Sequence, residues 1–296
     1  MHSRWPGRRL ARALAALLML AGAITAIGLA RALAAPAAGC ENWTGTQPPD
    51  PGGSNTLDSV AIVSACDAWA VGFQAGNGMD LTLTEHWNGS AWTVVPSPNP
   101  GSVNLLRSVR GISPTDVWAV GEYIDGSMDK TLILHWDGRT WTQVTSPNPG
   151  SAGSQLFGVR PVSGTDAWAV GVCVIGGVDQ TLALHWNGHT WARVSTPDPG
   201  GPSVSSSLVG VTAVSATNAW AVGVTAPGAS AGTRAIIRTS TLILRWDGSA
   251  WTRVPSPNAG VGSQLFAVAS SSASNIWAVG IFSDGESDHA FAVHCC

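Results

Sequence analysis

Short apolar segments separated by turn residues recur along the chain after its first forty residues, and no helical period competes with them. In one unit these segments cover 106–112, 117–122, 131–136 and 140–144, and β-branched and aromatic residues dominate all four. An Asp-Gly pair at 137–138 separates the last two segments, as is typical of a tight hairpin turn. The pattern predicts four short antiparallel strands, which we call A, B, C and D.

The same unit occurs five times, with a spacing of 49 to 57 residues. Strand B carries Trp-Ala-Val-Gly, beginning at Trp69, Trp118, Trp168, Trp220 and Trp277. In four of the units strand C ends with a Trp, at Trp87, Trp136, Trp186 and Trp246. In the same units strand D begins with a Trp, at Trp92, Trp141, Trp191 and Trp251. Four antiparallel strands in a repeat of this length form a blade of a β-propeller. We therefore expect an all-β, five-bladed β-propeller whose units start near Leu57, Leu106, Leu156, Leu208 and Leu265.

The last unit has no strand D of its own. The segment Trp43–Gly52 aligns with Trp141–Gly150, which contains strand D of the second unit. We therefore predict that residues 41–48 form the missing strand of the last blade and close the ring, which leaves no lone sheet edge.

Cysteines lie on both sides of the predicted ring closure, which we call the seam. Cys295 stands where the last strand C should carry its Trp, and Cys40 lies three residues before Trp43. We predict a disulfide from Cys40 to Cys295 or Cys296, which would persist in an exported protein. The alternative is a truncated or frameshifted end that carries cysteines by accident. Two further cysteines are expected to be small buried thiols, Cys66 and Cys173.

The N-terminal segment has the features of an export signal. Four Arg residues precede an uncharged Ala/Leu-rich run, and Ala32-Leu33-Ala34 fits a cleavage site. We assign 1–34 to a signal peptide, 35–40 to a short linker and 41–296 to the propeller. Two alternatives remain, a lipid anchor at Cys40 and an uncleaved membrane anchor. In each case we expect the protein to be secreted or held at the cell surface.

The low content of charged residues and the acidic net charge exclude or disfavour some classes of protein. Only 11% of the 296 residues are charged, which excludes a coiled coil or a charged helical bundle. Removing residues 1–34 takes away five Arg and no acid, which leaves 10 basic and 18 acidic residues. A nucleic-acid partner requires a basic surface, so this class is disfavoured.

The unit resembles several families of propeller repeats. Asp116–Gly121 is similar to the Gly-containing strand of kelch repeats, and His135–Trp141 to their aromatic, turn and Trp segment. The Trp-rich units also resemble the blades of tectonin and tachylectin lectins, a likeness that implies sugar binding. The closest resemblance is to secreted bacterial repeat proteins with the same WAVG, HWNG and SPNPG motifs, and it covers about 41–296.

Candidate binding residues lie in the variable loops, because function is usually carried on variable loops of a rigid frame. The B–C loops contain Asn77, Tyr123, Asp125, Arg234, Arg238, Asp284 and Glu286. Matching acids precede strand C at Asp80, Asp129, Asp179 and Asp288; a hairpin-turn role is favoured for them over binding Ca²⁺ or a polyol. The repeated Trp residues and the Ser-x-x-Asp turns are expected to be structural. The strand C histidines are expected to bind no metal, because equivalent positions on different blades lie too far apart.

The resulting hypothesis is a monomeric, non-catalytic module that binds a glycan or an extracellular protein through the face formed by the B–C and D–A loops. It needs no cofactor, apart from the possible Ca²⁺. One alternative is a glycan-active hydrolase or lyase with its site in the central funnel; Asp58 is the one acid on a strand A that is peculiar to a single unit. The other alternative is a purely structural extracellular protein.

Overall fold

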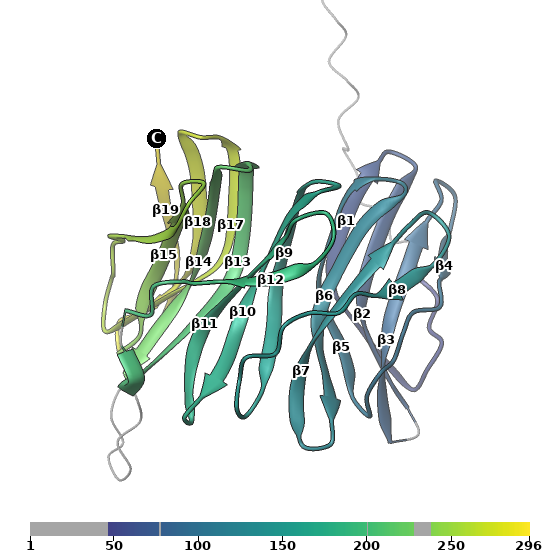
Figure 1. Ribbon diagram of the computed structural model, residues 1–296, viewed down its shortest axis with the longest axis horizontal. Coiled ribbons are helices and arrows are strands. Elements are labelled where there is room, and N and C mark those ends of the chain that lie inside the picture. Colours follow the sequence, from purple (N-terminus) through teal and green to yellow (C-terminus); the bar gives the residue numbers. More distant parts are fainter. Residues whose placement is uncertain (1–46, 77, 200, 228–237) are drawn as a thin grey trace, which may run out of the picture. The chain divides into compact units, whose positions relative to one another are not determined.

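A computed structural model describes residues 47–296 except 77, 200 and 228–237 (Figure 1). The described residues form five antiparallel sheets and one short 3₁₀ helix, η1 (Gly201–Ser203). The first sheet contains β1 (Ser54–Ser64), β2 (Asp67–Gly76), β3 (Met79–Trp87) and β4 (Trp92–Val94). The second contains β5 (Asn104–Ser113), β6 (Asp116–Asp125), β7 (Met128–Trp136) and β8 (Trp141–Gln143). The third contains β9 (Ser154–Ser163), β10 (Asp166–Ile175), β11 (Val178–Trp186) and β12 (Trp191–Val194). The fourth contains β13 (Val204–Ser215), β14 (Asn218–Pro227), β15 (Ser240–Trp246) and β16 (Trp251–Val254), and the fifth β17 (Gly262–Ser272), β18 (Asn275–Ser283) and β19 (Asp288–Cys295).

The order of strands within each sheet follows the chain, so the predicted repeated unit of four antiparallel strands is confirmed. Successive sheets lie side by side, because β1 packs on β5, β5 on β9, β9 on β13 and β13 on β17 (Figure 1). A cavity of about 180 Å³ is lined by all five of these first strands, through Ser59, Arg107, Phe157, Val209 and Phe266. Blades of a β-propeller are arranged in this way around a central channel.

The repeated Trp residues join each sheet to the next. Trp69 of the first sheet contacts Trp136 and Trp141 of the second, with ring centroids 4.7 and 5.0 Å apart. The same contacts recur for Trp118 with Trp186 and Trp191, and for Trp168 with Trp246 and Trp251. Edge-to-face aromatic pairs contribute about 0.5–1.5 kcal/mol beyond the area they bury. In these sheets the Trp residues serve packing, as expected from their repetition.

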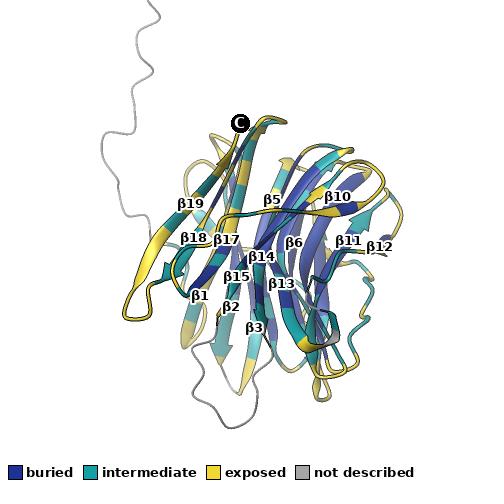
Figure 2. Ribbon diagram, turned by 90° about the vertical axis from the view of Figure 1, so that its left-hand side faces the viewer, coloured by how far each residue is buried: buried dark blue, intermediate teal, exposed yellow. Residues whose placement is uncertain are grey.

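Each end of the series presents a sheet face without a neighbour among the described residues. Trp277 on β18 is 49% exposed, although its counterparts Trp69 and Trp168 are fully buried. Val60 on β1 is 57% exposed, whereas the equivalent Val109 of the second sheet is fully buried. Figure 2 shows β19 exposed over much of its length, in contrast to the strands of the middle sheets. The two end faces are therefore apolar surfaces of the kind that neighbouring sheets cover elsewhere.

The Gly of each Trp-Ala-Val-Gly segment is required by a close approach of two strands. A Cβ on Gly121 would lie 1.9 Å from the carbonyl oxygen of Leu105. The register of β5 on β6 shifts there, between Leu106 and Ser108. A β-bulge of this kind brings backbone against backbone, so only glycine fits.

The predicted C–D turns are confirmed in detail. The carboxylate of Asp137 accepts hydrogen bonds from the backbone N–H groups of Arg139 and Thr140, at 2.8 and 2.9 Å. These bonds hold the pKa of Asp137 below its usual range. An Asx side chain thus closes the turn on its own backbone.

The cysteines differ in part from expectation. Cys173 is buried as predicted, but Cys66 is exposed, so the prediction of a buried thiol there was wrong. Cys66 lies in the turn between β1 and β2, where the second sheet has Thr115, and a turn at the end of a sheet has no core to bury it. Cys295 and Cys296 are exposed and form no disulfide with another described cysteine. Cys40 lies outside the described residues, so its disulfide stays a prediction. No helix among the described residues is long and apolar enough to cross a membrane.

Candidate functional site

The B–C hairpins and the D–A links meet at one edge of the sheets. In the second sheet the N–H of Ile124, at the hairpin, donates to the carbonyl of Val103, at the end of the link, over 2.9 Å. In the third sheet Val174 donates in the same way to Gly153. We call this side, with the hairpins after β2, β6, β10 and β18 and the links before β5, β9, β13 and β17, the loop edge.

The predicted binding residues that are described lie at or beside this edge, but the structure does not bring them together. Asp125, Arg238, Asp284 and Glu286 are exposed, whereas Tyr123 is half-buried and packs against the core between the first two sheets. Within the described part of the chain, no hydrogen bond or ion pair joins candidates from different hairpins. Asn77 and Arg234 lie outside the described residues.

Asp284 stabilises its own hairpin. Its carboxylate accepts backbone hydrogen bonds from Glu286 and Ser287, at 2.8 and 2.9 Å, and pairs with His289 at 2.8 Å. These hydrogen bonds hold the pKa of Asp284 well below its usual range. The carboxylate is therefore ionised and already partnered, which leaves Glu286 as the freer acid of this hairpin.

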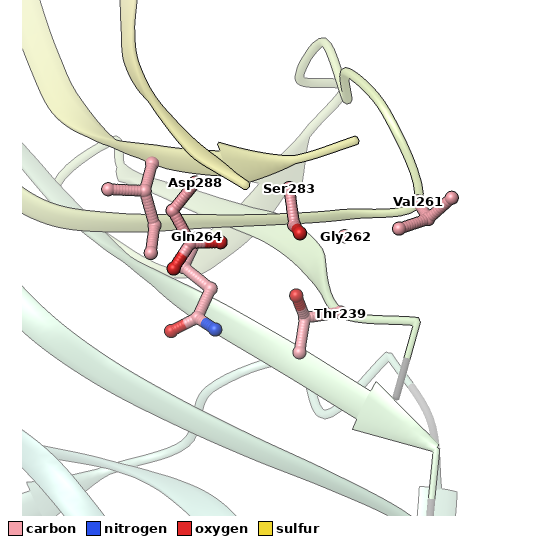
Figure 3. A pocket seen from close by; sticks show the side chains of 7 residues that line it. Thr239, Val261, Gly262, Gln264, Ser283 and Asp288 are labelled. Atoms are coloured by element: carbon pink, nitrogen blue, oxygen red, sulfur yellow. The ribbon is translucent and has the colours of Figure 1, made fainter. Parts of the chain in front are cut away.

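A crevice lies between the fourth and fifth sheets at the loop edge. Figure 3 shows its polar lining, with Thr239 before β15, Gln264 on β17, Ser283 on β18 and Asp288 on β19. Its volume is about 270 Å³, and Ile281 adds an apolar wall. The hairpin that carries Asp284 and Glu286 follows directly after Ser283.

The same crevice recurs beside the third sheet, with a volume of about 330 Å³. There Gln155, the counterpart of Gln264, donates from Nε2 to Oδ2 of Asp129 over 2.9 Å. We call these two spaces the loop-edge crevices. Asp129, Asp179 and Asp288 thus line crevices beside their sheets. In the described chain no three His, Cys, Asp or Glu side chains are grouped to hold a metal ion.

A charged cluster on the inner strands was predicted only in part from the sequence. Arg107 on β5 donates to Oε1 of Glu122 from both Nε and a terminal nitrogen, at 3.1 and 2.7 Å, and to Asp58 of β1 at 3.1 Å. The Glu122 side chain is only 5% exposed, and its Oε2 has no hydrogen-bond partner among the described residues. Burial raises the pKa of Glu122 more than Arg107 lowers it.

Only Asp58 had been singled out from the sequence. Glu122 replaces an apolar residue at its repeat position, which the other units fill with Phe73, Val172, Val224 and Ile281. Arg107 likewise stands where later units have Phe157, Val209 and Phe266. A charge at a position that is otherwise apolar was the signal that could have revealed the cluster.

The strand C histidines pair with the acids of the Ser-x-x-Asp turns. Nε2 of His135 lies 3.0 Å from Oδ1 of Asp116, and the ring lies 4.2 Å from that of Trp118. Trp118 donates to the same carboxylate oxygen at 2.9 Å. These turns therefore tie strands B and C together within a sheet.

No protein-family profile and no curated protein matches this chain. Similar folds occur among solved structures, and three examples are distant in sequence. YCF48 from Cyanidioschyzon merolae is 13% identical, with 84% of this chain and 98% of that chain covered and a TM-score of 0.35. A PL25 ulvan lyase bound to a saccharide is 12% identical, with 86% and 69% covered and a TM-score of 0.48. A GH93 α-L-arabinofuranosidase of Fusarium graminearum is 10% identical, with 83% and 95% covered and a TM-score of 0.46.

Proposed function

We propose that this protein is an exported, non-catalytic binding module that takes a glycan at the loop edge. The observation that carries the proposal is the crevice lined by Thr239, Gln264, Ser283 and Asp288. Its hydroxyl, amide and carboxylate groups offer both hydrogen-bond donors and acceptors beside an apolar wall, a combination suited to a sugar ring. The sequence also predicts an extracellular protein as an alternative ligand at the same edge.

The test is a glycan array with the purified chain, followed by titration of any bound glycan. We expect Gln264→Ala to weaken binding by about two- to tenfold, because it removes neutral hydrogen bonds of about 0.5–1.5 kcal/mol. Asp288→Ala should weaken binding by about tenfold or more, because a hydrogen bond to a charged group contributes about 1.5–3 kcal/mol. Arg139→Ala, an exposed residue in a C–D turn away from the loop edge, is the matched control and should bind normally. Absence of binding to every glycan would reject the sugar ligand.

A second candidate, a glycan-active hydrolase or lyase, is supported by Glu122. A buried carboxyl with a raised pKa beside Asp58 and Arg107 is the arrangement from which an acid catalyst can be built. Incubation with a panel of polysaccharides tests this candidate, with new reducing ends or unsaturated products as the readout. If activity is found, Glu122→Gln should abolish it while Arg139→Ala, in a C–D turn, retains it; no product from any substrate would reject the enzyme.

We also propose that the ring is closed by the segment that contains Trp43. The fifth sheet has three described strands, and beside it lies an apolar groove of about 650 Å³ lined by Trp220, Ile243, Phe291, Val293 and Cys295. In the preceding sheets a strand D Trp is packed at the equivalent place. Gln47 and Pro48, at the end of the predicted strand 41–48, are not in a strand, and neither are their counterparts after β8.

Closure also brings Trp277 against Trp87 and Trp92, by the rule that the other sheets follow. Mass analysis of the mature protein, with and without reductant, tests the seam. A difference of two hydrogens together with linked Cys40 and Cys295 or Cys296 peptides supports a covalent closure. Fully reduced cysteines, or lipid on Cys40, would reject the disulfide.

A further inference from the structure

Two arginines on neighbouring inner strands form no ion pair with a described acid. Arg110 on β5 and Arg160 on β9 stand at the same repeat position, opposite Trp118 and Trp168 of strand B. This position is near the A–B turns, at the edge of the sheets opposite the loop edge, which we call the turn edge. Within the described ranges the ion pairs of arginine all belong to Arg107, so no acid balances these two charges.

Backbone carbonyls hold both guanidinium groups in place. A terminal nitrogen of Arg110 donates to the carbonyl of Val60 on β1 over 3.2 Å and to that of Val109 over 2.7 Å. Arg160 donates to the carbonyl of Ala213 on β13 over 3.4 Å, while its Nε is buried without a partner among the described residues. Each arginine therefore keeps nitrogen donors for a further acceptor, and a buried donor left unpaired is costly.

The two positive charges are close enough to affect each other. Arg110 remains open to solvent, yet neighbouring groups displace part of its hydration. This desolvation and the positive charge of Arg160 both lower the pKa of Arg110. Like charges held together in this way favour an anion between them, because the anion offsets their repulsion and supplies hydrogen-bond acceptors.

Small side chains leave room for such an anion. Arg110 lines the cavity of about 180 Å³ that all five inner strands share. At the same repeat position the other sheets have Ala61, Thr212 and Ala269, so the two arginines are the large side chains there. The cavity therefore opens onto a pair of cationic groups among small neighbours.

We propose that Arg110 and Arg160 bind a carboxylate at the turn edge of the central channel. A planar guanidinium group presents donors at a spacing that matches the two oxygens of a carboxylate. The mature chain has 18 acidic and 10 basic residues, yet it pairs none of its described acids with these arginines. An external anion is therefore the partner that the site requires. The carboxylate belongs to an acidic sugar or to a small organic acid, and the experiment separates these sources.

The test is isothermal titration of the full mature chain with succinate and, separately, with D-glucuronate, at pH 7 and low ionic strength. We expect one site. Arg110→Thr and Arg160→Thr each introduce the residue that the fourth sheet has at this position, so both variants should fold. Each should bind at least about tenfold more weakly, because charge-assisted hydrogen bonds are lost. Arg110→Lys keeps the charge without the planar fork and should also bind more weakly.

Arg253→Thr is the matched control, because it removes an exposed arginine from β16, an outer strand, and should leave binding unchanged. Tighter binding of D-glucuronate than of succinate identifies an acidic sugar as the source, and the reverse order identifies a small organic acid. Absence of binding by both ligands, or binding that persists unchanged in Arg110→Thr and Arg160→Thr, would overturn the proposal. The glycan proposal concerns other residues at the opposite edge, so failure of one leaves the other standing.

Discussion

Single residues that break the repeat carry most of the chemistry of this chain. Glu85 on β3 and Glu122 on β6 each place a buried acid where the other sheets have an apolar side chain, and Arg107 places a charge where the third, fourth and fifth sheets do. Burial raises the pKa of both Glu residues, so their ionisation opposes folding. Such residues are visible in an alignment of the five units, but what they contact depends on how neighbouring sheets pack.

Burial and the nearby charge of Asp50 raise the pKa of Glu85, which predicts a pH-dependent stability. Unfolding returns this pKa to about 4.5, so the folded chain binds more protons between that value and the higher folded value. The contribution of Glu85 to stability is therefore greatest below pH 4.5 and falls as pH rises through the folded pKa. In urea unfolding between pH 4 and 8, Glu85→Leu should gain stability relative to the unmodified chain as pH increases. A constant difference between the two curves would contradict the assignment.

At the scale of the strands and turns, the turn residues determine where the chain reverses direction between two strands. The Asp137 turn was predicted from its Asp-Gly pair, whereas the bulge at Gly121 was not predicted, although its Gly recurs in every repeat. The bulge adds a specific constraint, because it brings the backbones of β5 and β6 too close for any side chain.

Substitution of Gly121 tests this constraint. Gly121→Ala should destabilise the chain by at least about 2–3 kcal/mol, because the new methyl group collides with the Leu105 carbonyl. The control is Gly126→Ala in the exposed B–C hairpin, where φ is +67° and nothing lies within 4 Å; it should cost only about 1–2 kcal/mol. Denaturant unfolding of both variants measures the difference, and equal losses would argue against the clash.

The sequence predicted the strands better than their ends. Strand B was expected to end at residue 122 and strand C to start at 131, yet β6 runs to Asp125 and β7 begins at Met128. The added residues 123–125 and 128–130 pair in register, but apolar and charged side chains do not alternate along them, so the sequence pattern did not predict them as strand. The crevices and the Arg107 cluster could not be predicted from the sequence, because they form between sheets. Asp58 and Arg107 lie 49 positions apart and meet only because β1 packs on β5.

At the scale of the whole molecule, the same Trp contact holds successive sheets together. The strand B Trp of one sheet packs against two Trp residues of the sheet that follows, and this contact occurs three times in the described chain. If the ring closes as we propose, the two exposed end faces supply the two halves of one further contact of this kind. Closure then depends on packing as well as on the shared strand.

Truncation of Trp277 tests closure of the ring directly. Trp168→Ala removes a fully buried ring and should cost about 3–5 kcal/mol. If the end faces meet, Trp277→Ala should cost nearly as much, as measured by denaturant unfolding of the mature chain. A loss below about 1 kcal/mol would instead indicate that Trp277 remains half-exposed in solution.

The contact of Trp69 with Trp136 and Trp141 has one further consequence. At the three junctions between the first four sheets, a strand B Trp packs on the strand C and D Trp residues of the sheet that follows, so these junctions use the same residues. A gene that duplicates or deletes a whole repeat therefore preserves the residues required at each new junction. Copy number in such a lineage can change in single steps, limited by the geometry of the circle and not by the invention of new interfaces.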